Sequence, residues 1–520
     1  MPQVKLALGW NRTRPAHELL GSEDGFVQCS KLQNYLVKDG KIFKVGGTGA
    51  FNSTALTYPV PWVHRSYHKR ADGTFRKAGF LFSGGVLYHC NDVAGTLTED
   101  KAGFRKESYP THVTMQVSDN SILYFISGED EICKYDGNGS YQWEGTSICE
   151  DIGRTILGGA VHLDRIWWWS KDSSFLAYST TLKPEDFSTD AGDIVVGQET
   201  DSVIRRVIVG ADETLYVFKN NSIWQLFGRT VSSFQFRKVT DKYGLATKRA
   251  ICPAGSGFIF LDEFTKELYF FGGNERSIIP LTERDIKLRD IIDRTQVDKV
   301  AMTVHDGYFR FAFKHRDDSL YQDRELVYAI DEPGPGGLPK WSMIKGSKVL
   351  SYSVWNREGD NDELVTGRSD TGKIMYHSKP PFYRRGKNWD TTTAIETQVR
   401  TKEVIVSDEL VARFSDFFIK ARPGSTTTPV KFSYFLDGRY SEEGIKNILM
   451  SGETREVGEL DVSQQAFLND RIQPLHDRAR GTSISFEVYD NNLNTDMELY
   501  SIAYKAKARY KVRNQLSHVT

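Results

Sequence analysis

The sequence contains few cysteines, and their spacing excludes the usual cysteine-based sites. Five cysteines occur in 520 residues, an odd number, and none lies in a CxxC pair. A disulfide framework or a zinc site would require paired or clustered cysteines. We therefore expect all five to be free thiols that act as small core residues.

The sequence also lacks long apolar runs and an excess of charge of one sign. No uninterrupted stretch of about 18 apolar residues occurs, which excludes a membrane-spanning helix. The amino-terminal apolar run is too short for a signal peptide, so we expect synthesis in a cytoplasm without export. Lys and Arg total 67 against 68 Asp and Glu. Any surface that binds nucleic acid must therefore be local.

Common catalytic signatures are absent as well. The sequence has no GxSxG elbow, HExxH helix, GxGxxG fingerprint or EF-hand loop. Residues 367–373 match the first seven positions of a P-loop, but Ile374 replaces the Ser or Thr that would bind magnesium. A P-loop must lead into a helix, whereas residues 374–377 have the pattern of a strand. We interpret this segment as a β-turn and predict neither enzyme activity nor a cofactor.

Two groups of polar residues lack the full ligand set of a metal site. His64 and His68 share one face of a predicted strand, but no third ligand is evident. The acidic loops 358–363 and 490–496 offer oxygen atoms without the spacing of a known calcium loop. We predict a surface strand for the histidines, solvated turns for the acidic loops, and no metal.

What the sequence does contain is short runs in which apolar and polar residues alternate, a pattern that predicts an all-β fold. From residue 78 to residue 383 these runs form packets of three or four strands at intervals of about 40 to 50 residues, the period of β-propeller blades. We predict a β-propeller of six or seven irregular blades. The blades should start near Gly79, Thr114, Leu157, Ile204, Arg249, Lys299 and Lys348.

The segments on either side of the predicted propeller indicate two further parts. For residues 1–77 we predict an amino-terminal extended arm and a hairpin that together complete the propeller. The turn of this hairpin should lie at residues 38–40. Residues 384–393 are the predicted linker. Residues 394–520 have strands and turns about every 8 to 15 residues, which suits a carboxy-terminal β-sandwich.

Tryptophans are a candidate binding feature. Trp143, Trp224 and the run 167–169 could form a platform on which sugar rings stack. Adjacent residues of a strand point to opposite faces, however. We therefore predict that Trp167 and Trp169 pack between blades while Trp168 packs on the other side.

The last predicted strand is the one patterned charge feature. Basic residues occupy every second position of it, so all five should lie on one face: Lys505, Lys507, Arg509, Lys511 and Arg513. A phosphate backbone or an acidic neighbouring subunit could neutralise this basic strand. A solvated edge strand that uses lysine to discourage aggregation explains the pattern equally well.

Fragments that combine a turn with an aromatic strand occur along most of the chain. They are Gly25–Gln28 followed by Leu36–Gly40, Tyr135–Gly137, Asp164–Arg165, Tyr178–Ser179 with Pro184–Phe187, Val217–Trp224, Gly257–Leu261 and Leu499–Tyr504. In this order they resemble the β-propeller tail proteins of bacteriophages, particularly the tail nozzle or packaged-DNA stabilisation proteins of short-tailed phages.

The resemblance implies a structural protein of the virion tail. It implies a homo-oligomeric ring of about six subunits below the portal or adaptor protein, with tail fibre or tail needle proteins docked on it. Double-stranded DNA would pass through the ring without sequence specificity, and the protein would not insert into a membrane. The five basic residues would then face the DNA channel or a neighbouring subunit. The alternative is a lectin-like propeller on a phage tail that binds a glycan or a receptor.

Overall fold

The computed structural model of the chain consists almost entirely of β-strands. It describes residues 3–5, 29–38, 41–52, 54–69, 73–90, 95–118, 120–137, 142–197, 202–317, 321–334, 337, 339–356, 362–377, 393–405, 410–423, 428–437, 439–440, 446–450, 468–472, 480–492 and 497–511. The α-helix of these ranges is α1 (Ile148–Ile152), and short 3-10 turns occur beside it. In the same ranges no helix is long and apolar enough to cross a membrane. All five cysteines are free, as predicted.

The chain forms two compact units and passes between them four times. The first unit contains residues 1–49, 326–347 and 378–520, and the second contains residues 50–325 and 348–377. This division differs from the sequential domains 1–77, 78–383 and 394–520 expected from the sequence. Most of the predicted linker, 384–393, lies outside the described residues.

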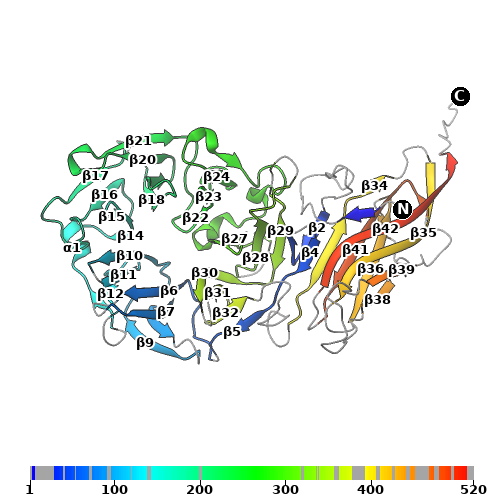
Figure 1. Ribbon diagram of the computed structural model, residues 1–520, viewed down its shortest axis with the longest axis horizontal. Helices are drawn as coiled ribbons and strands as arrows, with labels where there is room; N and C mark the ends of the chain where they lie inside the picture. Colours follow the sequence, from blue (N-terminus) through cyan, green and yellow to red (C-terminus); the bar gives the residue numbers. More distant parts are fainter. Residues whose placement is uncertain are drawn as a thin grey trace. The chain divides into compact units, whose positions relative to one another are not determined.

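The second unit is a β-propeller built from four-stranded antiparallel sheets (Figure 1). Six such sheets run in the orders β6-β7-β8-β9, β10-β11-β12-β13, β14-β15-β16-β17, β18-β19-β20-β21, β22-β23-β24-β25 and β30-β31-β32-β5. The strands are β5 (Thr48–Ala50), β6 (Trp62–Lys69), β7 (Phe75–Ser83), β8 (Val86–Cys90), β9 (Leu97–Ala102), β10 (Thr111–Val117), β11 (Asn120–Ile126), β12 (Cys133–Tyr135), β13 (Glu144–Gly145), β14 (Ile156–His162), β15 (Arg165–Ser170), β16 (Phe175–Tyr178), β17 (Gly192–Val195), β18 (Ile204–Val209), β19 (Leu215–Lys219), β20 (Ile223–Phe227), β21 (Gln235–Thr240), β22 (Ile251–Ala254), β23 (Gly257–Leu261), β24 (Leu268–Phe271), β25 (Ile279–Pro280), β30 (Val349–Asn356), β31 (Asp362–Arg368) and β32 (Ile374–His377).

The first strand of each sheet lies on the inside of the ring. Contacts join β10 to β14, β14 to β18, and β30 to β6. The hairpin of β26 (Ala301–His305) and β27 (Tyr308–Phe313) holds a seventh position, because β26 contacts both β22 and β30. The prediction of six or seven blades is confirmed. Six of the seven first strands begin within three residues of the predicted starts, whereas the first blade begins at Trp62 rather than near Gly79.

Apolar side chains fill the spaces between neighbouring sheets. Trp167 and Trp169 pack in one cluster with residues of β18 and β19. Trp168 packs in another cluster with residues of β10 and β11, as alternation along the strand predicted. All three indole rings are almost fully buried. Burying an aromatic side chain contributes about 2 to 3 kcal/mol to the stability of the fold. Because the tryptophans of β15 pack on both of its faces, this strand stabilises the contacts of its sheet with both neighbouring sheets.

Residues before the first blade close the ring. Phe51 N donates to the carbonyl of Ile374 at 2.8 Å, and Leu56 forms an isolated bridge with Gly372. Asn52 is buried; its Nδ2 donates to the Gly372 carbonyl at 3.0 Å, and its Oδ1 accepts from Ile374 N at 2.8 Å. The segment that precedes the blades therefore does complete the propeller, but the hairpin expected to help belongs to the first unit.

The first unit consists of strands from both ends of the chain (Figure 1). One sheet has the order β3-β4-β42-β35-β39, with β1 paired to β42 and β40 to β35. The other contains β29-β2-β33-β41-β36-β37, with β34 paired to β41 and β38 to β36. The strands are β1 (Gln3–Lys5), β2 (Cys29–Gln33), β3 (Tyr35–Lys38), β4 (Lys41–Lys44), β29 (Ser342–Lys345), β33 (Thr397–Thr401), β34 (Val404–Ile405), β35 (Leu410–Pro423), β36 (Thr428–Leu436), β37 (Arg439–Tyr440), β38 (Lys446–Met450), β39 (Leu468–Ile472), β40 (Arg480–Gly481), β41 (Ser483–Asp490) and β42 (Met497–Lys511).

A buried ion pair joins the two sheets of this unit. Lys44 Nζ, at the end of β4, lies 2.8 Å from Asp490 Oδ2, at the end of β41, and both side chains are at most 1% exposed. The β3–β4 hairpin pairs Lys38 with Lys41, and residues 39–40 of the predicted turn lie outside the described residues. The two-sheet arrangement expected for residues 394–520 is present, but it includes amino-terminal strands that the sequence assigned to the propeller.

Candidate functional site

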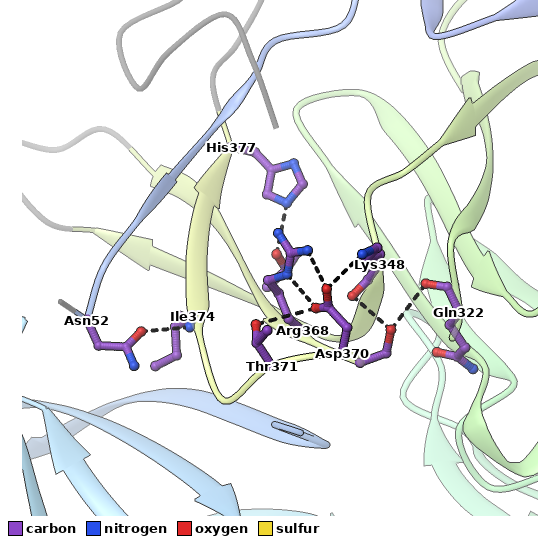
Figure 2. A network of polar contacts seen from close by, with 10 residues as sticks. Asn52, Gln322, Lys348, Arg368, Asp370, Thr371, Ile374 and His377 are labelled. Carbon is purple, nitrogen blue, oxygen red and sulfur yellow. Dashed lines mark hydrogen bonds and ion pairs between the residues drawn. The ribbon is translucent and has the colours of Figure 1, made fainter. Parts of the chain in front are cut away.

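The P-loop-like segment 367–373 is a tight turn between β31 and β32, as predicted (Figure 2). Asp370 accepts bonds from Arg368 Nε at 2.7 Å, Arg368 Nη2 at 2.8 Å and Lys348 Nζ at 2.9 Å. Burial opposes ionisation of Asp370, but these bonds lower its pKa to about 2. A Cβ on Gly367 would lie 2.3 Å from the Val60 carbonyl oxygen. The glycine therefore permits close approach of the ring-closing segment.

The two histidines of β6 are not on a surface strand, so that prediction is wrong. His68 is 0% exposed, and its Nδ1 lies 3.1 Å from the Ser121 carbonyl. The His64 ring lies 3.9 Å from the His112 ring, between centroids. Both are enclosed because β6 is an inner strand that packs against the next sheet. Across the described ranges, no group of three or more His, Cys, Asp or Glu side chains could hold a metal.

The two acidic loops fall partly outside the described residues. Of the first loop only residues 362–363 are described, and of the second only residues 490–492. Asp490 is buried in its ion pair with Lys44 and also accepts from Asn492 N at 2.9 Å. The predicted solvated turn is therefore wrong for Asp490, whose carboxylate is committed to structural bonds.

The basic strand forms β42, as the alternating pattern predicted. In its antiparallel pairing with β35, Lys505 lies opposite Asp416, Lys507 opposite Arg413, and Lys511 opposite Leu410. Arg509 falls where the register shifts between Ala508 and Tyr510, which interrupts the regular alternation. Arg513 lies outside the described residues. A role for these five residues in binding DNA or a neighbouring subunit stays a prediction.

A cavity of about 160 Å³ lies among the inner strands of the propeller. Residues from β6, β10, β18, β22, β26 and β30, or immediately before these strands, line it: Pro61, Trp62, Val63, Pro110, Thr111, His112, Arg206, Lys248, Arg249, Ile251, Ala301, Met302, Ser351 and Tyr352. We call this space the axial cavity. It brings together side chains that are far apart in the sequence.

Three cationic side chains line the axial cavity without an ion pair in the described ranges: Arg206, Lys248 and Arg249. Arg249 donates through Nη2 to the Leu350 carbonyl, and its guanidinium lies 5.0 Å from the Tyr109 ring centroid. Its Nη1, like Arg206 Nε, is buried without a hydrogen-bond partner among the described residues. In that part of the chain, none of the three forms an ion pair with a carboxylate.

Enclosure changes the acid–base properties of these cations. Burial lowers the pKa of Arg206 and of Arg249 to about 10, so both stay charged at neutral pH. Burial, followed by repulsion from Arg249 and Arg206, lowers the pKa of Lys248 to about 7. The charge of Glu129 raises the pKa of Lys248 and so partly opposes this effect. Its carboxylate, however, already accepts from Lys171 and, at 3.2 Å, from Arg105.

His112 adds a neutral donor to the same cavity. Burial, followed by repulsion from Arg206, lowers its pKa to about 4. Trp62 Nε1 donates to His112 Nδ1 at 3.1 Å. The proton of the neutral ring therefore resides on Nε2.

Irregular backbone positions Arg206 and the Leu350 carbonyl. The β18–β19 ladder has a register shift between Ile204 and Arg206, and the β30–β31 ladder has one between Val349 and Ser351. Such bulges re-aim the residues that they contain.

A second cavity, of about 460 Å³, shares Pro61 with the axial cavity and includes Tyr58, Lys106, Tyr109, Lys299, Lys314 and Tyr321 in its lining.

Reasoning from the sequence did not find the axial cavity, although a signal was present. The pairs Arg205–Arg206 and Lys248–Arg249 stand next to two predicted blade starts, Ile204 and Arg249. The first strand of a propeller blade lies nearest the axis. Basic residues at blade starts therefore indicate a positive centre.

Comparisons with known proteins do not assign the chain to a family. No protein-family model matches it. An alignment over 217 residues, which covers 39% of this chain, is 24% identical to surfactin synthase subunit 2 of Bacillus subtilis (strain 168). The chain spans only 6% of the length of that protein.

Solved structures similar to the chain include virginiamycin B lyase from Staphylococcus aureus, with 11% identity and a TM-score of 0.40. That similarity covers 65% of this chain and 99% of the lyase. The Cps50 (Swd1) β-propeller domain of Myceliophteria thermophila is similar at 9% identity and a TM-score of 0.39. It covers 63% of this chain and 99% of that domain.

Proposed function

We propose that the chain is a structural, non-catalytic subunit of a bacteriophage tail, of the nozzle or head-to-tail ring type. In this role it surrounds the DNA exit channel, helps to retain packaged DNA, and docks portal or adaptor proteins and fibres. The observation that carries the proposal is the architecture: a closed propeller is inserted into a two-sheet unit that contains strands from both ends of the chain. The ordered fragments that resemble phage tail proteins support it.

This architecture suits a part that must resist force. Strand β42 pairs with β35 along its length and also with β1 and β4. Because both ends of the chain belong to one hydrogen-bonded sheet, the first unit cannot open at either end without breaking that sheet. The propeller is closed by Asn52 and its neighbours in a similar way. Propeller loops then remain free to dock other chains.

The lectin-like alternative has less support. Trp143 and the run Trp167–Trp169 are at most 7% exposed, so they cannot form a platform for sugar rings. Trp224 is half-buried, and its Nε1 donates to Ser222 Oγ at 2.9 Å. The observed side chains therefore favour a scaffold over a glycan-binding surface.

Quantitative mass spectrometry of purified particles from the source tests the proposal. The copy number of this chain is measured against the major capsid protein, whose number per particle is fixed by the capsid lattice. We expect a small constant value, about six or twelve, because a closed ring fixes the number of subunits. Absence of the chain from purified particles would refute the proposal.

A charge-reversal variant tests the role of the basic strand in the same particles. Lys507→Glu, Arg509→Glu and Lys511→Glu together should reduce assembly or DNA retention. The matched control reverses Arg105, Lys183 and Lys242 of the propeller, which are 67–71% exposed. Equal infectivity of the two triple variants and the wild type would show that the basic strand has no such role.

A further inference from the structure

The axial cavity has the chemistry of a site for a small, multiply charged anion. We propose that it binds a phosphate group, carried either by inorganic phosphate or by a phosphomonoester. This site does not depend on the proposed tail function, because it is argued only from side chains inside the propeller. It would exist equally in a tail ring or in any other assembly.

Donors converge on the cavity from separate parts of the ring. Arg206 lies on β18, Lys248 and Arg249 lie just before β22, and His112 lies on β10. Arg206 Nε and Arg249 Nη1 are enclosed without a hydrogen-bond partner among the described residues, and the Arg206 guanidinium lies 5.7 Å from the Trp169 ring centroid. His112 has its Nε2 proton free to donate. Guanidinium groups and oxyanions form strong, charge-assisted hydrogen bonds. Several cations around one point match a group with several anionic oxygens.

The size of the axial cavity limits the occupant. A volume of about 160 Å³ holds several water molecules or one tetrahedral oxyanion. It is too small for a polymer such as DNA or for a peptide segment. A carboxylate would fit, but its single charge would leave most of the positive charge of the three cations uncompensated. A dianion compensates more of this positive charge than a monoanion does, which favours phosphate over a carboxylate.

The electrostatic cost of the unoccupied cavity supports the same conclusion. Unpaired charges are seldom buried, because desolvation disfavours them unless a partner compensates. Two carboxylates act on these cations without forming an ion pair with them among the described residues. Glu129 is engaged by Lys171 and Arg105, and Asp298, which raises the pKa of Arg249, lies in the lining of the larger cavity. A bound phosphate would supply the partner and would favour the protonated form of Lys248.

The larger cavity offers a place for an organic group attached to the phosphate. The two cavities share Pro61. Arg249 of the axial cavity stacks on Tyr109, which lines the larger one. Aromatic rings of Tyr58, Tyr109 and Tyr321 line that space and could contact a ring-containing ester group. Comparing inorganic phosphate with phenyl phosphate therefore distinguishes the two sources of the phosphate group.

Isothermal titration calorimetry on the full chain tests the proposal, with sodium phosphate, phenyl phosphate and sodium acetate as probes at equal ionic strength in chloride. We expect saturable binding of a phosphate probe at about one per chain and at least tenfold weaker binding of acetate. The Arg206→Gln variant should bind phosphate at least tenfold more weakly, because it loses a charge-assisted bond. Tighter binding of phenyl phosphate than of inorganic phosphate would assign the site to phosphomonoesters, and the reverse to free phosphate.

A matched control separates loss of the site from loss of the fold. Arg237, on β21 of the same sheet as Arg206, is exposed and lies over the Phe227 ring at 4.2 Å. The Arg237→Gln variant should bind like the wild type. If Arg206→Gln does not fold, Lys248→Met takes its place, because removing a partly buried charge that has no ion pair should not destabilise the propeller.

Proton uptake provides a second readout that a nonspecific effect would not change. Titrations at pH 8 in buffers of different ionisation enthalpy should show protons taken up as phosphate binds, and this uptake should vanish in Lys248→Met. The titratable groups that face Lys248 are Arg206, Arg249, His112, Tyr352, Glu129 and Lys171. Phosphate binding no tighter than acetate binding, or unchanged in both Arg206→Gln and Lys248→Met, would overturn the proposal.

Discussion

Replacing Lys248 by methionine should stabilise the propeller, which is the opposite of the usual effect of altering an enclosed side chain. The substitution keeps a long, flexible side chain and removes one of three cations that repel one another in the axial cavity. Because the pKa of Lys248 falls from 10.5 to about 7, the folded protein holds this proton less strongly than the unfolded chain does. In phosphate-free buffer, the positive charge of Lys248 therefore makes the free energy of folding less favourable.

The size and pH dependence of this effect follow from the pKa. Each pKa unit corresponds to about 1.4 kcal/mol, so the wild type loses at most about 5 kcal/mol below pH 7. Screening by water in the partly open cavity reduces this to about 1 to 3 kcal/mol. The penalty shrinks as the pH rises from about 7 towards 10.5, because the folded protein then releases the proton. By pH 9.5 less than about a third of it remains.

Thermal unfolding in phosphate-free buffer at pH 6.5 and pH 9.5 measures the effect. Lys248→Met should unfold about 2 to 6 °C above the wild type at pH 6.5, at roughly 2 °C for each kcal/mol, with a smaller difference at pH 9.5. Lys242→Met is the matched control, since Lys242 is 71% exposed and paired with Glu275 at 2.8 Å. A lower melting temperature for Lys248→Met at pH 6.5, with an unchanged control, would refute the reasoning.

Three further substitutions test the ring closure, the turn and the buried ion pair. Asn52→Ala should lower the free energy of unfolding by about 2 to 3 kcal/mol in urea titrations, because two hydrogen bonds that close the ring are lost; an unchanged midpoint would show that these bonds do not matter. The wild type should lose about 2 kcal/mol as the pH falls from about 4 to about 2, since the Asp370 pKa is lowered to about 2. An equal loss in Asp370→Asn would assign the acid sensitivity to other groups. Lys44→Met should cost about 3 to 5 kcal/mol, and adding Asp490→Leu should recover much of that loss; no recovery in the double variant would contradict the pairing.

Local pattern was enough to predict most of the propeller. Runs of alternating residues located six of the seven inner strands, and alternation alone placed Trp167 and Trp169 on one side of their sheet and Trp168 on the other. The turn at residues 367–373 was predicted because the residue after it does not suit a P-loop and the next residues suit a strand. These features depend on neighbours within a few residues, which a sequence displays directly.

Features that depend on distant residues were missed. Strand β6 follows Pro59 and Pro61 and contains two basic residues and two histidines, so its sequence resembles a connecting arm. Only its place inside the ring makes it a blade strand. Asp490 looked like part of a solvated loop because its partner, Lys44, is 446 residues away. The axial cavity likewise combines residues from six different inner strands or the segments before them.

Ring closure by residues near the amino terminus also imposes an order on folding during synthesis. Asn52 leaves the ribosome early, yet its partners Gly372 and Ile374 follow about 320 residues later. At about 5 to 20 residues per second, the edge that Asn52 will complete does not exist for roughly 15 to 65 s. The free edge of strand β4 stays unpaired longer still, until β42 is made about 450 residues later. The nascent chain must therefore keep unpaired strand edges from aggregating during this interval, and the loop entropy of joining such distant segments makes closure a late, slow step.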